Sequence, residues 1–120
     1  MLMQLTGIAV VRPRLERVAH DGCRLFHVDR VPARLLCTYC GPGTQWVPDA
    51  AAERSALGKG DNAAICPDPA AVRAISRGDV ALLKGDLWPG NGGRGLIHRS
   101  PPLGRSGTRR LLLALDVTAA

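Results

Sequence analysis

Two histidines and one aspartate are the residues of this sequence best suited to chemistry at a metal ion. His27 and Asp29 stand two positions apart in the stretch C-R-L-F-H-V-D-R, and His98 follows much later in L-I-H-R-S-P-P. Two imidazoles and a carboxylate can hold a divalent ion on one side and leave its remaining coordination positions open. The sequence therefore predicts a metal site formed by His27, Asp29 and His98.

The local pattern predicts that His27 and Asp29 point the same way. Residues 23–29 follow an Asp-Gly turn signal, and on a strand the side chains of residues two apart share a face. On its own, such a pair is more often an ordinary hydrogen-bonded pair on a strand, and His98 alone could cap a turn. The three together, in this order, favour the metal site. Arg109, shortly after His98, could hold a carboxylate by a bidentate pair.

The composition predicts a small domain built from short strands. The chain has 120 residues, of which 46% are hydrophobic and 22% charged, with 14 Gly and 9 Pro to form turns. Strands are expected at residues 10–19, 23–29, 33–39, 80–85, 96–99 and 109–116. Residues 49–69 are expected to form a loop, and residues 69–77 a short helix with Asp68 as its cap. The fold class expected is all-β, a single small sandwich or barrel over residues 1–120 with at most one or two short helices.

Several classes of function are disfavoured. The formal net charge is +6, but the arginines are scattered and few aromatic residues are available to stack on bases, which argues against nucleic acid. No run approaches the roughly 20 apolar residues that span a bilayer, and the N-terminus lacks the features of a signal peptide. A cytoplasmic location with reduced cysteines is therefore expected. Cys37 and Cys40 form a C-x-x-C pair without a second pair, which favours structural thiols over a metal site.

At this point two family resemblances become visible. The order H-V-D, G-P-G-T-Q-W-V-P, G-D-V-A-L-L and H-R-S-P-P-L-G-R-S-G-T-R-R resembles the iron- and 2-oxoglutarate-dependent dioxygenases of the prolyl-hydroxylase-like type. That resemblance implies a double-stranded β-helix, also called a jelly roll and similar to cupins. More specific is the similarity to a bacterial family, domain of unknown function 1826. It extends over F-H-V-D-x-V-P-x-R-L-L-x-T-Y-x-G-P-G-T-x-W-x-P and over G-D-V-A-L-L-K-G to G-L-I-H-R-S-P-P, more than half the chain.

Specific roles are implied by these resemblances. His27, Asp29 and His98 would be iron ligands, and Arg109 would bind 2-oxoglutarate. Arg110 is the alternative anchor, because a shift of one residue reverses the face to which a strand side chain points. From the neighbouring strand, further contacts to the cosubstrate are expected from Thr38 and Tyr39, and Trp46 would take the place of an apolar aromatic residue. Members of the second family usually have a longer N-terminus, so a truncated start is expected here.

Three functions follow from these expectations. The first is an Fe(II)/2-oxoglutarate-dependent oxygenase of unidentified substrate. The second is a non-catalytic protein that binds zinc at the same three residues, since members of the second family are often encoded beside genes for zinc homeostasis. The third is a metal-free scaffold that acts as a structural or interaction module.

Overall fold

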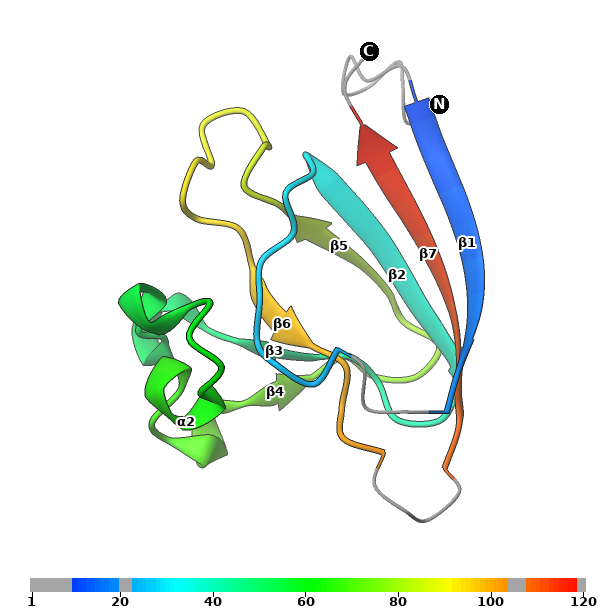
Figure 1. Ribbon diagram of the computed structural model, residues 1–120. Coiled ribbons are helices and arrows are strands. Elements are labelled where there is room, and N and C mark those ends of the chain that lie inside the picture. The colour runs from blue at the N-terminus through cyan, green and yellow to red at the C-terminus, as the bar shows by residue number, and fades with distance from the viewer. Residues whose placement is uncertain (1–9, 20–22, 104–107, 119–120) are drawn as a thin grey trace.

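The protein folds into two antiparallel β-sheets that face each other, with short helical turns beside the smaller sheet (Figure 1). The computed structural model describes residues 10–19, 23–103 and 108–118. The mainly β architecture expected from the composition is confirmed. The turn predicted at residues 20–22 lies outside the described residues. No helix among the described residues is long and apolar enough to cross a membrane.

The larger sheet has four strands in the order β1, β7, β2, β5. These strands are β1 (Val10–Val18), β2 (Ala33–Cys40), β5 (Val80–Lys84) and β7 (Arg110–Thr118). All four lie within one or two residues of the predicted runs. Opposite residues in an antiparallel pair share a face, so the pairing of Leu36 with both Ala114 and Ala81 sets the inner face of this sheet.

The smaller sheet has three strands in the order β4, β3, β6, and the predicted strand at residues 23–29 is attached to its free edge. Its strands are β3 (Gln45–Val47), β4 (Arg73–Ala74) and β6 (Ile97–Arg99). Of residues 23–29, only His27 forms a bridge, to His98 of β6. This segment is shorter than predicted because the carbonyls of Asp29, Val31 and Pro32 already accept hydrogen bonds from the backbone of residues 85–87.

Residues 49–71 differ from the expectation of a loop followed by a helix at residues 69–77. They contain three 3-10 turns, η1 (Asp49–Ala51), η2 (Arg54–Ala56) and η3 (Pro69–Ala71), and the helix α2 (Asn62–Ile65). Asp68 caps η3 as predicted, accepting a hydrogen bond from Ala70 N. The helix predicted there was wrong beyond residue 71, because Arg73 pairs with Trp46 of β3 and the chain becomes extended.

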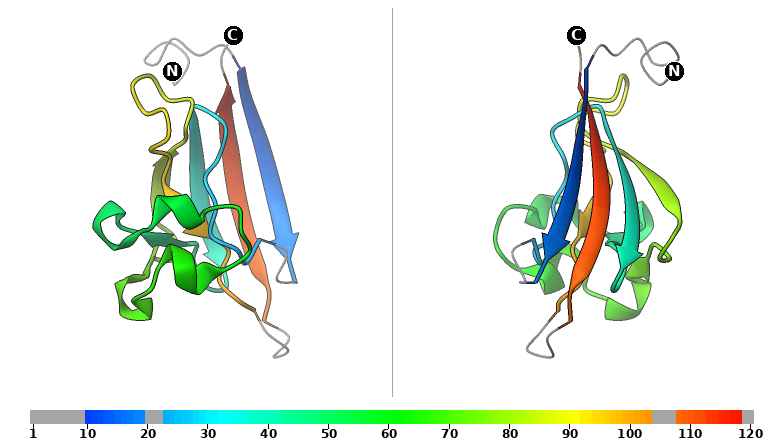
Figure 2. Two further views of the ribbon diagram at one scale, coloured as in Figure 1. Left: turned by 60° about the vertical axis from the view of Figure 1, so that its left-hand side comes forward. Right: turned by 90° about the vertical axis from the view of Figure 1, so that its right-hand side faces the viewer.

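Two apolar clusters hold the layers together. One lies between the two sheets and consists of the buried residues Leu36, Leu83, Leu112 and Ala114. The other joins the smaller sheet to the helical turns and consists of Phe26, Val47, Ile65, Cys66 and Ile97. The helical turns and the larger sheet therefore lie on opposite sides of the smaller sheet, as both views in Figure 2 show. The segment bearing His27 is fixed between them.

Candidate metal centre

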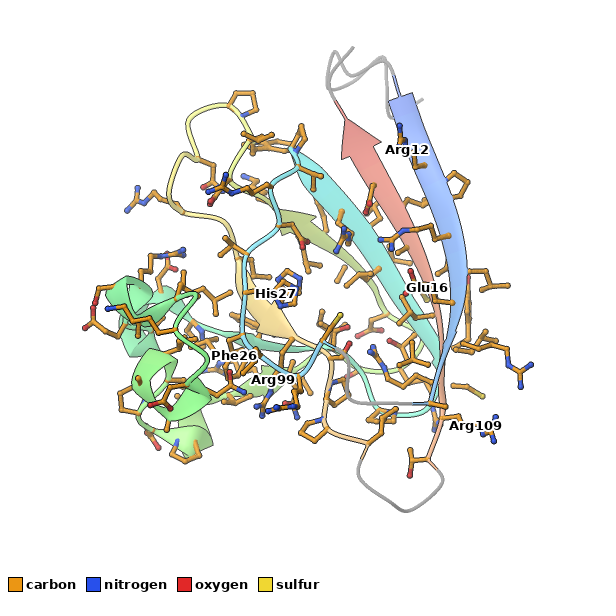
Figure 3. All side chains as sticks on the ribbon, viewed as in Figure 1. Arg12, Glu16, Phe26, His27, Arg99 and Arg109 are labelled. Carbon is orange, nitrogen blue, oxygen red and sulfur yellow. The ribbon has the colours of Figure 1, made fainter. Side chains whose placement is uncertain are left out.

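His27 and His98 are brought together by backbone pairing. His27 N donates to His98 O at 3.0 Å, and His98 N donates to His27 O at 3.0 Å. Because residues directly opposite in an antiparallel pair point to the same face, both imidazoles project from the smaller sheet on one side. Their ring centroids are 4.6 Å apart. Figure 3 shows the His27 ring pointing from its segment toward the larger sheet.

Asp29 completes the group predicted from the sequence. Its Oδ1 lies 3.9 Å from His27 Nε2, and its Oδ2 lies 3.3 Å from His98 Nε2. One ligand atom from each of the three residues lies within 4.8 Å of the others. These separations allow one ion to contact all three atoms, since metal–nitrogen and metal–oxygen bonds are about 2.0–2.2 Å long. Among the described residues, no other His, Cys, Asp and Glu side chains form such a group.

Hydrogen bonds fix the orientation of both imidazoles. Nδ1 of His27 lies 2.8 Å from the Leu25 carbonyl oxygen, and Nδ1 of His98 lies 2.9 Å from the Leu96 carbonyl oxygen. A carbonyl oxygen only accepts hydrogen bonds, so each Nδ1 carries a proton and donates it. In a neutral ring this leaves the lone pair on Nε2, the atom that faces Asp29. Histidines that bind metals are held in the same way, by a hydrogen bond from the other ring nitrogen.

The carboxylate of Asp29 has one oxygen engaged and the other available. Arg34 Nη1 donates to Oδ1 at 3.0 Å, whereas Oδ2 is buried and has no hydrogen-bond partner. The nearest polar atom to face it is Nε2 of His98, which in the tautomer described above has no proton to donate. A buried acceptor without a partner costs about 1–3 kcal/mol. Oδ2 and the two Nε2 lone pairs therefore fit a cation, which would satisfy all three atoms at once.

The charges around the site keep its ligands in the forms that bind metal. Burial lowers the pKa of His27, and His98 and Arg34 lower it further, against the opposing effects of Leu25 O and Asp29. Burial alone would raise the pKa of Asp29, but the nearby ring of His98 and the charge of Arg34 lower it overall. A neutral imidazole and an ionised carboxylate are the ligand forms that metal binding requires.

Arg34 holds Asp29 in place from β2. Its Nε and Nη2 donate to the two oxygens of Asp116 on β7, while Nη1 donates to Asp29. The register places Arg34 directly opposite Asp116. The bonds to Asp116 therefore fix the guanidinium in the position from which it donates to Asp29. Nothing in the sequence pattern singled out Arg34 as part of the site. Only the pairing of β2 with β7 reveals it.

The structure separates the two arginines predicted as cosubstrate anchors. Arg109 is exposed and Figure 3 shows it pointing away from the sheets, far from His27. Arg110 is 2% exposed and lines the cavity that contains both histidines. Arg110 pairs with Val18 in the sheet, on the same face as Leu112 and Ala114. Of the two candidate anchors, Arg110 therefore lines the cavity and Arg109 does not, by the one-residue shift of face noted above.

Arg110 is surrounded by neutral oxygen atoms. Its guanidinium donates to Pro42 O at 2.8 Å, Ser100 Oγ at 3.0 Å, Thr44 Oγ1 at 3.0 Å and Thr38 Oγ1 at 3.3 Å. Burial lowers its pKa, an effect that Cys23 and Glu16 partly oppose. Within the described part of the chain, no carboxylate forms an ion pair with it. The three hydroxyl groups accept from the guanidinium and each keeps a proton to donate.

The remaining predicted residues divide between the site and the surface. Thr38 is buried and accepts a hydrogen bond from Arg110, but it does not line the cavity. Tyr39 is 52% exposed and does not line the cavity, because the next residue along β2 points to the other side of the sheet. Trp46 lies on β3 with Arg73 over its ring, outside the same cavity. Thr44 and Ser100 were missed, because no local pattern distinguishes them from other hydroxyl residues.

One cavity joins the two histidines of the candidate metal centre to Arg110. Its volume is about 110 Å³, and its polar lining includes His27, His98, Arg34, Ser100 and Arg110. On the scale where one water needs roughly 10–15 Å³, this holds several waters or a small organic acid. Cys23 also lines it, whereas Cys37 and Cys40 do not, and these cysteines are free thiols. The cavity thus combines part of a candidate cation site with a buried arginine that forms no ion pair among the described residues, although Glu16 also lines it.

Comparison with known proteins identifies the family. A family model described as "Protein of unknown function (DUF1826)" matches residues 1–116. The chain belongs to this family. No curated protein and no solved structure matches the chain. The matched residues include both sheets and the whole candidate metal centre. The family description assigns no activity.

Proposed function

We propose that this member of the DUF1826 family is an Fe(II)/2-oxoglutarate-dependent oxygenase built on a double-stranded β-helix. The observation that carries the proposal is the group of His27, Asp29 and His98, whose two histidines share a cavity with Arg110, a buried arginine that forms no ion pair among the described residues. Three protein ligands on one side of an ion leave positions for a chelating cosubstrate and oxygen. The guanidinium group of Arg110 would bind the distal carboxylate of the cosubstrate.

The strand order supports the proposed fold. From β1 to β7 the chain alternates between the sheets, through the His27 segment before β2 and through β6 before β7, except that β3 and β4 follow each other within the smaller sheet. The larger sheet reads β1-β7-β2-β5, and the smaller reads β4-β3-β6 with the His27 segment beyond β6. Eight segments that cross between two facing sheets in this way are the connection pattern of a jelly roll. In such a fold the space between the sheets is the natural place for a ligand.

The chain's own residues would have separate roles. His27, Asp29 and His98 would hold the iron, with Arg34 fixing the carboxylate of Asp29. Arg110, with the hydroxyl groups of Thr44 and Ser100, would bind a carboxylate of 2-oxoglutarate. When bound, the iron would supply the activation of oxygen that accompanies decarboxylation of the cosubstrate.

A second cavity offers room for the substrate. It has a volume of about 500 Å³ and shares His27 with the smaller cavity, and its lining is mostly apolar: Leu25, Phe26, Val28, Leu57 and Ile65. Apolar clefts of several hundred Å³ are typical of small-molecule sites. We place the substrate on this side of His27, opposite the cavity that would hold the cosubstrate.

The first test is an anaerobic titration of the metal-free protein with ferrous iron and 2-oxoglutarate, observed by visible absorption. The chelate of both with two histidines and a carboxylate gives a charge-transfer band, which should appear in the wild type and vanish in His98→Ala. Two further variants test the anchor. Arg110→Lys should weaken 2-oxoglutarate binding about tenfold or more, because lysine lacks the guanidinium fork. Arg109→Lys, one residue away and exposed, should leave it unchanged.

A second function is favoured by the small size of the cosubstrate cavity and by the four bonds that Arg110 already donates. In this alternative the three ligands bind zinc without catalysis. Nitrogen and oxygen ligands generally bind zinc more tightly than ferrous iron. If zinc binds one to one, is lost in His98→Ala, and no charge-transfer band forms with iron and 2-oxoglutarate, this function replaces the first.

A further inference from the structure

One edge of the larger sheet offers unpaired backbone groups. β5 stands at the end of the strand order β1-β7-β2-β5, so among the described residues no strand pairs with its outer edge (Figure 1). Lys84 O accepts from Leu96 N, which shows that the backbone groups of Lys84 point away from β2. Along an antiparallel strand the direction of these groups alternates from one residue to the next. The N–H and C=O groups of Val80 and Leu82 therefore point outward as well.

The two edge strands of this sheet differ in how they are protected against pairing with another strand. β1, with the sequence VVRPRLERV, contains Pro13 and four charged side chains. Proline and charged residues on an edge strand prevent the addition of a further strand. β5, with the sequence VALLK, has no charge before Lys84, and Val80 and Leu82 are 71% and 48% exposed. The edge of β5 therefore remains open to strand addition.

A groove with a volume of about 460 Å³ lies beside this edge. β5, the end of β3 and the loop before β6 all contribute to its lining. The apolar part of the lining consists of Trp46, Val47, Pro48, Leu82 and Leu96. None of the residues that line the groove lines the cavity beside the metal centre or the larger apolar cavity. The groove is therefore a separate site.

The charged side chains of the groove leave an excess of positive charge at one end of β5. Lys84 and Arg94 line the groove, and neither forms an ion pair with a described carboxylate. The carboxylate that lines the groove, that of Asp49, is already paired with Arg54 at 2.6 Å. At the other end of β5, Asp79 precedes the strand. A ligand that complements the groove is therefore negatively charged at its Lys84 end.

We propose that the outer edge of β5 and this groove bind an acidic, extended peptide segment of a partner protein, which adds to the larger sheet as a further strand. The unpaired N–H and C=O groups select an extended backbone, the apolar lining selects apolar side chains, and the two cations select carboxylates. Because Lys84 ends β5, the carboxylates lie in the N-terminal half of a peptide that pairs antiparallel.

Other occupants fit the groove less well. Residues 1–9 of the chain, M-L-M-Q-L-T-G-I-A, contain no Asp or Glu and do not match the two cations. The loop before β6 and the end of β3 stand beside the edge. A single strand fits between them, whereas a second copy would bring its own loop and strand to the same place. Single-stranded nucleic acid binds through several aromatic residues, and Trp46 is the one aromatic residue that lines the groove.

The test is the binding of a fluorescein-labelled peptide to the full chain, measured by fluorescence anisotropy at low salt. The probe is E-E-L-E-V-T-V with both ends blocked, which should bind with a dissociation constant below about 1 mM. The peptide K-K-L-K-V-T-V should not bind, because its charge is reversed. A form of the acidic peptide with every backbone nitrogen methylated should not compete, because it cannot donate to the strand edge. Amide hydrogen exchange at Leu82 should slow when the acidic peptide is bound.

Variants of the chain locate the binding to β5. Leu82→Pro removes an N–H that points outward and keeps the bonds to β2, so it should raise the dissociation constant at least about fivefold. Arg94→Glu should raise it at least about threefold, an effect that added salt diminishes. The matched control is Leu15→Pro, the same substitution on the other edge strand, two positions after Pro13. It should leave the constant unchanged.

The proposal is overturned by a wild type that does not bind the acidic peptide, or that binds the lysine peptide or the methylated peptide equally well. A short oligothymidylate that binds where the peptide does not would assign the groove to nucleic acid. A wild type that sediments as a dimer and dissociates in Leu82→Pro would assign the edge to a second copy of the chain. Far-ultraviolet circular dichroism verifies that the variants fold. Should Leu82→Pro fail to fold, Arg94→Glu and the methylated peptide still decide the question.

Discussion

Replacing Asp29 by asparagine tests whether Asp29 is a metal ligand or chiefly the ion-pair partner of Arg34. In the metal-free protein the new side-chain oxygen can still accept from Arg34 Nη1, which lies 3.0 Å from Oδ1. The new amide nitrogen takes the position of Oδ2, 3.3 Å from Nε2 of His98, and can donate to its lone pair. The substitution thus provides the hydrogen bond that the buried Oδ2 lacks.

The magnitudes can be worked out from these contacts. Satisfying a buried acceptor contributes about 1–3 kcal/mol, while exchanging a charge-assisted bond for a neutral one costs about 1–1.5 kcal/mol. The free energy of unfolding of the metal-free variant should therefore lie between about 0.5 kcal/mol below and about 2 kcal/mol above that of the wild type. If Asp29 were chiefly the ion-pair partner of Arg34, breaking that buried pair would cost about 3–5 kcal/mol. The two explanations differ by more than the error of a denaturation experiment.

Bound metal should stabilise the wild type more than the Asp29→Asn variant. At a free concentration of a hundred times the dissociation constant, a bound ion adds about 2.7 kcal/mol to the stability of the wild type. Asp29→Asn should lose most of this gain, because the neutral amide is a much weaker ligand than the carboxylate. The matched control is Asp116→Asn, which alters the other carboxylate held by Arg34 but no metal ligand. That variant should keep the metal-linked gain.

Urea unfolding at pH 8 measures both quantities, first with a chelator and then with saturating zinc or manganese. This pH lies well above the ordinary histidine pKa of about 6.5, and burial lowers the pKa of His27 further, so the His27 ring is neutral. A loss of 3 kcal/mol or more in chelator would show that Asp29 is structural. A metal-linked gain that survives in Asp29→Asn would show that the ion, if bound, does not use this carboxylate. Either result refutes the interpretation of Oδ2 as an open ligand.

Three further predictions concern the residues that support the site. Arg34→Lys should lower metal affinity about 10–100-fold in a competition titration, because lysine cannot bridge both carboxylates at once. Asn62→Ala should lower the free energy of unfolding by about 1–3 kcal/mol in urea, because it removes two hydrogen bonds to the backbone beside the first histidine. Gly43→Ala should cost more than about 3 kcal/mol, since a Cβ there would lie 1.8 Å from Ile75 O, whereas Gly92→Ala, which meets nothing within 4 Å, should be within about 0.5 kcal/mol of the wild type.

The three metal ligands could be predicted from the sequence because their geometry depends on local rules. Residues two apart on an extended segment share a face, which fixes His27 relative to Asp29. His98 could be proposed as their partner because of its residue type and its place after a glycine-rich loop, and the structure brings all three together. The four strands of the larger sheet were likewise predictable from apolar runs and the turns between them, whereas the short strands β3 and β4 were not predicted.

The anchor arginine could not be assigned because both faces of β7 are apolar. Leu111, Leu113 and Leu115 alternate with Leu112 and Ala114, so the pattern gives no sign of which set points inward. The structure resolves this through burial, since Leu112 and Ala114 belong to the core between the sheets, and Arg110 shares their face. The pattern is ambiguous because the face of β7 that carries Leu113 and Leu115 is also apolar, whereas polar residues at alternate positions would have marked a solvated face.

The metal centre depends on very few backbone contacts, and this links the fold to the site. His27 is fixed to β6 by the two hydrogen bonds it exchanges with His98, with one further bond from Ser100 N to Cys23 O. On the opposite edge the side-chain amide of Asn62 accepts from Phe26 N and donates to Arg24 O, as a neighbouring strand would. A slip of one residue in this short pairing would turn both His27 and Asp29 away from His98. An ion bound to all three side chains would oppose that slip directly, so metal binding and the position of this edge segment stabilise each other.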